Sequence, residues 1–391
     1  MNITIFFKDI NFKFSKRNLT IFSIDVSVQR RILNAFPEPK DLFERSYFQY
    51  KCQMKKLSTV MTLCQHIAAL FLISIYYFKF KYVLKKIKPN YRENCAVFLT
   101  DGVSIQTIPG CLFAEFNEII PCKFADSIHL GKIEKTVLIE LLKRYWYSPY
   151  FVFKCMLKIG MYAAKIEMYN PRTLISYSEY SFTSSVLTEY CRLKGVEHIN
   201  IMHGEKVFNI RDTFAQYDRY YVWDEHYINL LCDLRMNKEQ FRIALPDILN
   251  LNIQNKDEPL YDFTYYLGAE DSHEQTTIRD VLVEIGVPFS RICIRPHPIY
   301  SDLSQIKRIF SQFQIENSSQ VQLDISLSRT KYAVSLYSTV LYQAYISGKE
   351  TIINDVTNKS KYEKLKDLKY IMIEKPHRKL SEFLLFDKDA L

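Results

Sequence analysis

The stretch that decides the fold is "RTLISYSEYSFTSSVLTEYCRLKGVEHINIMHG", residues 172–204. Residues 173–178 and 197–202 are rich in apolar and β-branched side chains, which favours two strands. Between them, residues 181–195 begin with Ser and Thr and end at Gly195, a pattern typical of a capped helix. A strand, a helix and a second strand in this order predict a βαβ unit, in which both strands lie parallel in one sheet.

Strand and helix patterns alternate along most of the remaining chain. In the first half they are a strand at 93–100 and a strand followed by a helix over 219–232; in the second half they are strands at 263–268, 290–297, 331–337 and 350–355, and helices at 274–286, 301–313 and 338–348. Such alternation is typical of α/β domains built on a parallel sheet. We predict two Rossmann-like domains facing a cleft, residues 1–248 and 249–391, with the polar segment 247–262 at their junction.

Ligands of such sheets bind beyond the carboxyl ends of the strands, so polar residues there are the candidate site residues. In "RICIRPHPIYSD", residues 291–302, His297 lies between two prolines directly after a predicted strand. The prolines hold the histidine in a rigid, non-helical loop. Its imidazole could donate to an anion or carry a proton, and Arg295 could bind a carboxylate or phosphate at two points. The alternative is a rigid turn whose histidine binds a backbone carbonyl.

A second candidate anion site follows, with 41 residues from position 297 to position 338. Ser338 and Thr339 open a predicted helix, and the free N–H groups of a helix N-terminus favour a phosphate. Plain N-capping by the same hydroxyls is the alternative. Ser335, on the preceding strand, and Gly268, at the end of strand 263–268, complete the candidate donor-binding residues.

Strand ends in the first half carry titratable side chains. Asp101 precedes a glycine, Glu179 follows the strand at 173–178, and His203 and Glu205 belong to the segment "MHGEK". Each of these side chains could remove or orient a proton. The alternative for each is an ordinary polar turn residue.

Taken in order, these motifs resemble the signature of bacterial sialyltransferases and related CMP-sugar transferases, which have the GT-B fold of two Rossmann domains. The matching residues are Asp101-Gly102, His297-Pro298 and Ser338-Thr339. The resemblance implies that His297 meets the CMP phosphate or the donor carboxylate and assists departure of CMP. It also implies that Ser338 and Thr339 bind the phosphate, that residues 1–248 bind the acceptor and that residues 249–391 bind the nucleotide sugar.

The acidic motif departs from that family. The family has two acids before the glycine, and the first is usually the base, whereas this chain has Thr100 there. Asp101 then takes the role of base, or the role falls to Glu179, to His203 or, on the acceptor side, to Glu205.

A second family shares part of the pattern. "MHGEK" together with "RPHP" resembles teichoic-acid polymerases that use CDP-glycerol and also have GT-B folds. Capsule transferases that use 3-deoxy-manno-octulosonic acid show the same HP and Ser motifs. The first two families both place a cytidine nucleotide between the same two elements, so the resemblance implies a cytidine-linked donor more firmly than it implies one sugar.

The sequence therefore predicts an inverting glycosyltransferase of bacterial surface-polysaccharide synthesis, whether O-antigen, capsule or lipooligosaccharide. Its expected donor is CMP-sialic acid, and its expected acceptor is a glycan or a lipid-linked oligosaccharide. No DxD-like metal motif stands in a suitable place, so we expect no metal and no cofactor. A CDP-glycerol-type glycerophosphotransferase, a GT-B transferase with another nucleotide sugar and a nucleotide-sugar epimerase are the alternatives.

Composition narrows the class of protein. Of 391 residues, 48% are hydrophobic and 24% charged, which allows a sizeable core and argues against global disorder. A net charge of +9 fits an anionic partner, but the basic residues are spread out and no nucleic-acid motif is present, so nucleic acid is not expected. Nine scattered cysteines without a CxxC, and an N-terminus unlike a signal peptide, predict a cytoplasmic location.

Two basic-aromatic stretches, residues 63–88 and 141–165, favour a membrane surface as a further partner. The apolar run 63–78 has 16 residues, fewer than the roughly 20 of a spanning helix. The lysines that follow it would meet anionic headgroups; they are Lys79, Lys81, Lys85, Lys86 and Lys88. We expect peripheral attachment to the inner face of the plasma membrane, with ordinary core helices as the alternative.

Overall fold

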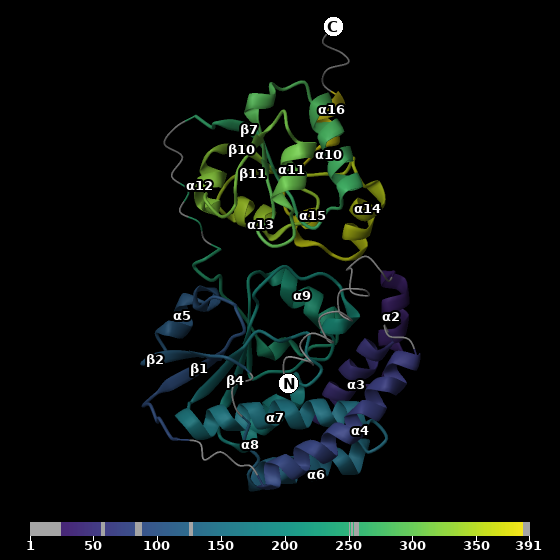
Figure 1. Ribbon diagram of the computed structural model, residues 1–391, viewed down its shortest axis with the longest axis vertical. Coiled ribbons are helices and arrows are strands. Elements are labelled where there is room, and N and C mark those ends of the chain that lie inside the picture. The colour runs from purple at the N-terminus through teal and green to yellow at the C-terminus, as the bar shows by residue number, and fades with distance from the viewer. Residues whose placement is uncertain are drawn as a thin grey trace. The chain divides into compact units, whose positions relative to one another are not determined.

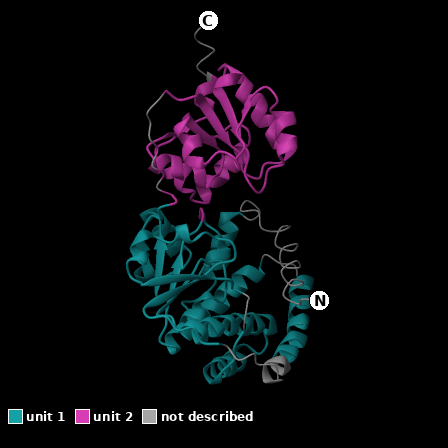
Figure 2. Cartoon of the chain, turned by 60° about the vertical axis from the view of Figure 1, so that its left-hand side comes forward, with its two compact units in different colours: residues 1–203, 208–247 teal, residues 204–207, 248–391 magenta. Residues whose placement is uncertain are grey.

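The computed structural model describes residues 25–55, 59–82, 88–124, 128–249, 251, 253 and 258–385, without the side chains of 77–82 and 385. Contacts divide the described chain into two units (Figures 1 and 2). Unit 1 contains the residues up to 203 together with 208–247, and unit 2 contains 204–207 and the residues from 248 onward. Each unit has one six-stranded parallel sheet, so the predicted pair of α/β units is confirmed. Within the predicted junction at 247–262, residues 250, 252 and 254–257 lie outside the described residues.

The sheet of unit 1 has the strand order β2-β1-β3-β4-β5-β6. Its strands are β1 (Cys95–Leu99), β2 (Glu118–Cys122), β3 (Thr173–Ser176), β4 (Glu197–Ile201), β5 (Arg219–Val222) and β6 (Phe241–Ile243). Strands β3 and β4 pair in parallel, with helix α8 (Ser184–Leu193) between them in the chain, as the βαβ pattern predicts. Strand β2 was not predicted, because it is a partly exposed edge strand in which Pro121 breaks the apolar run.

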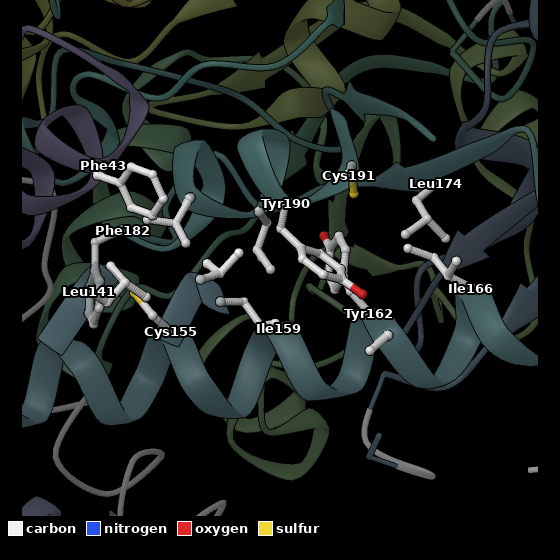
Figure 3. Packing of buried hydrophobic residues seen from close by; sticks show 14 of the residues in the cluster. Phe43, Leu141, Cys155, Ile159, Tyr162, Ile166, Leu174, Phe182, Tyr190 and Cys191 are labelled. Atoms are coloured by element: carbon white, nitrogen blue, oxygen red, sulfur yellow. The ribbon is translucent and has the colours of Figure 1, made fainter. Parts of the chain in front are cut away.

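Helices cover both faces of this sheet. They are α2 (Val26–Asn34), α3 (Leu42–Met54), α4 (Thr59–Tyr82), α5 (Gly110–Phe113), α6 (Lys132–Tyr145), α7 (Pro149–Tyr169), α8 and α9 (Glu225–Asp233). Along α7, Cys155, Ile159 and Tyr162 form one apolar stripe that packs in a core with Leu174 of β3 and Tyr190 of α8 (Figure 3). Helix α5 contributes to a second core on alternate residues of β1.

The basic-aromatic stretch 141–165 does not form one helix. Helix α6 ends at Tyr145, and α7 begins at Pro149, a residue that favours the first turn of a helix because it lacks the N–H that is unpaired there anyway. Most of α7 is buried, whereas α4 is largely exposed. The core-helix alternative therefore holds for α7, and α4 needs a separate account.

Unit 2 repeats the architecture, with strand order β12-β11-β10-β7-β8-β9. Its strands are β7 (Tyr261–Tyr266), β8 (Ile292–Arg295), β9 (Gln314–Ile315), β10 (Thr330–Ser335), β11 (Glu350–Ile353) and β12 (Arg378–Lys379). Its helices are α10 (Ser272–Glu284), α11 (Leu303–Ile309), α12 (Leu323–Ser328), α13 (Thr339–Ile346), α14 (Lys359–Asp367), α15 (Ile371–Glu374) and α16 (Ser381–Leu385). All four strands and three helices predicted for this half form, within a few residues of the predicted bounds.

A buried polar network joins α7, α8 and the sheet in unit 1. The ring of His198, on β4, lies 2.8 Å from the Thr188 hydroxyl, 3.1 Å from the Tyr162 hydroxyl and 3.2 Å from the Ser176 hydroxyl. Burial lowers the pKa of His198 to about 3, so the imidazole is neutral at physiological pH. Its two nitrogens therefore serve one as donor and one as acceptor, which suits hydroxyl partners because a hydroxyl can do either.

This network predicts an acid-labile contribution to stability. The unfolded histidine takes up a proton near pH 6.5, but the folded one does so only near pH 3. The contribution is therefore complete above pH 6.5 and is lost as the pH falls towards 3, at up to about 1.4 kcal/mol per pH unit. Urea unfolding of wild type and His198→Gln at several pH values should show their stability difference shrinking with acidity. The exposed His273→Gln is the control, and an equal pH dependence in all three proteins would contradict the assignment.

Candidate functional site

Three neighbouring strand ends form the candidate site of unit 2. Strand β7 pairs with β8 on one side and with β10 on the other, so His297, Gly268 and Ser338 follow adjacent strands at the carboxyl edge. Gly268 lies beside both neighbours of this edge: a Cβ there would be in ordinary van der Waals contact with the carbonyl oxygen of Tyr337 (3.7 Å) and the Glu270 carboxylate (3.6 Å), so the space does not require glycine. The sheet topology thus brings the predicted HP and Ser/Thr motifs to opposite sides of one strand end.

The His297 loop fixes the direction of the imidazole. Nδ1 accepts the backbone N–H groups of Ile299 (3.1 Å) and Tyr300 (3.3 Å), and the ring stacks on Tyr300 with centroids 4.5 Å apart. The backbone N–H of His297 donates to the Ser301 hydroxyl at 2.9 Å. Because Nδ1 is an acceptor, the proton of the neutral ring belongs on Nε2. Burial also lowers the pKa of His297, so the loop presents a neutral N–H donor from a half-buried ring.

Ser338 is the N-cap of α13. Its hydroxyl accepts the Val340 N–H at 3.2 Å, while the buried Tyr370 hydroxyl donates to the Ser338 carbonyl at 2.9 Å. The predicted alternative, N-capping, therefore occurs, and it uses the hydroxyl oxygen of Ser338 as a hydrogen-bond acceptor. The O–H of a serine that accepts a backbone N–H is still a donor, so capping and phosphate binding are compatible at this position. Thr339 follows at the first helical residue, half-buried at the same helix end.

Glu270 is a site residue that the sequence analysis missed. Its Oε2 accepts the Gly268 N–H at 2.6 Å, and burial raises the pKa of the Glu270 carboxyl. The carboxylate holds the turn that follows β7 and lies beside the candidate anion site. A raised pKa reduces the charge that Glu270 would set against a bound phosphate.

Two predicted donor-binding residues have other partners in the structure. The buried Arg295 donates to the Glu316 carboxylate at 2.7 Å and to the Val321 carbonyl at 2.8 Å. Ser335 is fully buried and donates to the Tyr266 carbonyl at 2.8 Å, between β10 and β7. Both side chains use their hydrogen bonds inside unit 2, so neither is included in the proposed site.

The carboxyl edge of unit 1 assembles Asp101, Tyr177 and His203. Strands β1, β3 and β4 are consecutive in the sheet, and these residues follow their ends. The Tyr177 hydroxyl accepts the Asp101 backbone N–H at 3.0 Å, and the Tyr177 ring lies 4.8 Å from the His203 ring. Tyr177, which no motif singled out, therefore connects the two predicted candidates, while the Asp101 carboxylate is exposed to solvent.

The other two carboxylates are placed differently. Glu179 is fully buried, and its Oε2 accepts the Asn200 side-chain N–H at 3.1 Å. Glu205 belongs to the segment 204–207, which is grouped with unit 2. A base has to reach a substrate proton, so the exposed Asp101 fits that role in unit 1 better than Glu179 does.

Lys158, on α7, is a second residue that the sequence analysis missed. Its Nζ lies 3.4 Å from the centroid of the Phe124 ring, and the Phe124 backbone N–H donates to Asp101 Oδ1 at 3.4 Å. Burial, with help from Lys154, lowers the pKa of Lys158 to about 7, and Asp101 partly opposes this shift. An ammonium that shares Phe124 with Asp101 offers an anion-binding or proton-carrying group at this edge. Within the described ranges, no group of three or more His, Cys, Asp or Glu side chains is placed to hold a metal ion.

Comparisons with known proteins give low similarities. No protein-family model matches the sequence, and the search of curated proteins gives no match. Among solved structures, the chain is similar to UDP-GlcNAc 2-epimerase from Methanocaldococcus jannaschii, with 12% identity, 72% of this chain and 93% of that chain covered and a TM-score of 0.40. It is also similar to the wall teichoic acid polymerase TagF, with 12% identity, 85% of this chain and 90% of that chain covered and a TM-score of 0.42. The similarity to the glycotransferase of kitacinnamycin has 10% identity, covers 75% of this chain and 86% of that chain, and has a TM-score of 0.41. Values this low assign no function to the chain.

The Lys158 environment predicts a lysine that titrates near neutrality. After reductive ¹³C-methylation, the Lys158 resonance, assigned by its loss in Lys158→Arg, should titrate with a midpoint of about 7. Because the folded pKa lies below the ordinary value of about 10.4, the unfolded chain holds the extra proton between these pH values, and this group makes the fold more stable as pH rises through them. A midpoint near that of ordinary lysines would contradict the described environment.

Proposed function

We propose that the protein is a GT-B-type glycosyltransferase that uses a cytidine-linked sugar, CMP-sialic acid in the first instance, to build a bacterial surface polysaccharide. One observation carries the proposal: the HP motif and the Ser/Thr motif, far apart in the chain, lie at the ends of β8 and β10 on either side of β7. That arrangement supports a phosphate-binding edge in unit 2. The resemblance of the motifs to CMP-sugar transferases supports the identity of the donor.

The unit 2 edge supplies donors for a departing phosphate. His297 offers Nε2–H from a ring that backbone N–H groups hold in place, so little reorganisation accompanies binding. The N-terminus of α13 adds the partial positive charge of a helix end, and the Ser338 hydroxyl adds an O–H. These groups would stabilise the charge that develops on the leaving nucleotide. We propose that they act without a divalent metal, and full activity in the presence of EDTA would support this.

The unit 1 edge supplies a base for the acceptor hydroxyl. Asp101 is the proposed base because its carboxylate is exposed and its backbone is held by Tyr177. His203, against the same tyrosine, is the second candidate. A base of either kind removes the proton of an attacking hydroxyl, and direct attack at the anomeric carbon inverts its configuration. The acceptor in this proposal is a glycan or a lipid-linked oligosaccharide, and the reaction is cytoplasmic.

A CDP-glycerol-type glycerophosphotransferase is the second candidate function. The observation that favours it is the position of His203 beside Tyr177 and Asp101, because the His-Gly segment is the motif that this chain shares with those polymerases. A nucleotide-sugar epimerase is a lesser candidate. Products distinguish the three: a new glycosidic bond with release of CMP, a new phosphodiester with release of CMP, or an epimerised nucleotide sugar without an acceptor.

The proposal predicts which nucleotide stabilises the protein. A ligand that binds only the native state raises stability by RT ln(1 + [L]/Kd). In a thermal-shift panel of CMP, CDP, UDP, GDP and dTDP, cytidine nucleotides should raise the melting temperature most. A clearly larger shift with UDP or GDP would overturn the cytidine-linked donor and leave the phosphate-binding edge intact.

Two substitutions test the phosphate-binding edge itself. His297→Ala should lower turnover by about 10²–10³-fold, the usual loss when a positioned donor or acid is removed, without unfolding the protein. Ser338→Ala should weaken nucleotide binding and cost about 1 kcal/mol of stability, because it removes the cap of α13. Asp224→Ala is the matched control, since Asp224 caps α9 of unit 1 through the His226 N–H.

Steady-state kinetics, nucleotide titrations and thermal melts of these variants separate the roles. Asp224→Ala should lose stability and keep nucleotide affinity. If Ser338→Ala behaves in the same way, the serine is a cap and no more. If His297→Ala retains wild-type turnover, the RPHP loop is a rigid turn with no part in the reaction.

A further inference from the structure

Helix α4 exposes an unusual amount of apolar surface. Its window Thr59–Tyr76 has a mean hydropathy of 1.6, long and apolar enough to cross a membrane, yet only 6% of the window is buried. The core helix of a soluble protein with this composition would be mostly buried, because an apolar helix in water otherwise loses the hydrophobic stabilisation of its side chains. The composition of α4 and its exposure therefore conflict unless something covers it.

The two faces of α4 are in different environments. On the inner face, Ala69 is buried, and Leu72, Ile73 and Tyr76 pack with Phe153 and Met156 of α7. On the outer face, six side chains recur at helical spacing and are exposed from 48% at Ile67 to 72% at Val60. These six, named here the α4 face, are Val60, Leu63, Ile67, Leu70, Phe71 and Ile75.

We propose that the α4 face binds the surface of an anionic phospholipid bilayer, with the helix lying in the plane of the membrane. Residues 59–78 contain no charged side chain, so the α4 face can enter the boundary between headgroups and acyl chains without burying a charge. Single exposed apolar residues are ordinary on protein surfaces, but six on one helix face form the kind of contiguous patch that marks an interaction site.

The charges that flank the helix select the partner. Between residues 55 and 88 the sequence has seven lysines and no aspartate or glutamate. Lysines precede the apolar run and follow it, and positive charges close to an anionic lipid surface are attracted to it. Of these lysines, Lys55 and Lys88 lie in the described chain and are exposed, while the side chains of Lys56, Lys79, Lys81, Lys85 and Lys86 fall outside the described residues. An anionic lipid surface matches apolar and basic groups together, whereas a second copy of this basic segment would bring like charges together.

Helix α6 lies beside the α4–α7 pair and is followed by two exposed aromatic residues. Its Leu138 packs in the cluster that α4 forms with α7, so α6 lies beside that pair. Just beyond the end of α6, Trp146 is 71% exposed and Tyr147 is 54% exposed. Tryptophan and tyrosine are enriched where membranes meet water, because their rings suit the headgroup level.

The packing of α4 favours lying in the membrane surface over crossing the membrane. By length and composition the window Thr59–Tyr76 could cross a membrane, although the apolar run 63–78 has only 16 residues. Crossing would pull the inner face from α7, expose Phe153 and Met156, and break the 3.0 Å hydrogen bond between the Tyr50 hydroxyl and His66 Nε2. In-plane binding keeps every one of these contacts and covers only the α4 face.

The test is co-sedimentation of the full chain with vesicles of phosphatidylcholine, with and without phosphatidylglycerol. Wild type should pellet with the anionic vesicles at low salt and be partly released at high salt, because salt screens exposed charges. Leu63→Gln together with Leu70→Gln should weaken the partition coefficient at least roughly tenfold, since each leucine side chain contributes through its burial. The matched control is Leu193→Gln on α8, where Leu193 is 53% exposed, close to the 59% of Leu63 and the 56% of Leu70.

Thermal melts should be unchanged in all variants because the substituted side chains are exposed. Three results would overturn the proposal: wild type stays in the supernatant, the double variant binds as wild type does, or the control loses binding equally. Self-association abolished by the double variant, without vesicle binding, would assign the α4 face to a second copy. Resistance of the bound protein to alkaline extraction would show that the helix spans. None of these measurements uses a nucleotide or an acceptor, so the outcome is independent of the proposed activity.

Discussion

The structure depends on one constraint: parallel sheets covered on both faces leave only the ends of their strands for polar chemistry. Every residue of β1, β3 and β8 is buried, since successive side chains point to opposite faces and both faces carry helices. A titratable group placed within such a strand must be neutral or paired, as His198 and Arg295 are. Polar groups that face solvent therefore gather beyond the strand ends, and Asp101, His297 and Ser338 lie beyond the carboxyl ends, where open α/β sheets bind their ligands.

This constraint explains why so much of the fold could be predicted from the sequence. Central strands are short apolar runs, and capped helices lie between them in the chain. The βαβ unit and the strands and helices of unit 2 could therefore be predicted from the sequence. The edge strands could not. β2 contains a proline and exposed residues, and β9 and β12 have two residues each, so their membership in the sheet depends on pairing with a neighbour and not on local composition. The α7 boundary was missed for the opposite reason, because apolar residues continue across the break at Pro149.

The candidate sites divide in the same way. Strand ends and turn residues are local features, so the sequence located His297, Ser338, Asp101 and His203. The contacts that define their chemistry are long-range. Arg295 forms an ion pair with Glu316, so it is not a donor-binding residue in the proposed site. Tyr177 contacts both Asp101 and His203. Lys158, on α7, contacts the ring of Phe124. No spacing rule predicts such pairs, because each depends on which segments, distant in the chain, become neighbours in the sheet or pack on it. The direction of the His297 ring is the exception, since it follows from backbone N–H groups two and three residues later.

For helix α4, the periodicity of the sequence does not predict which face is buried. A helix with one apolar stripe has an evident inner face, but α4 is apolar on both faces, and composition alone assigns it equally to a core, a bilayer or an interface. Packing resolves part of the ambiguity, because one face of α4 contacts α7. The other face is apolar and exposed, and contact with water does not stabilise it. What distinguishes the two faces is therefore the environment and not the residue types. The absence of acidic residues from 55 to 88 then becomes informative, because a helix exposed to water would gain solubility from either sign of charge, whereas only positive charge favours an anionic surface.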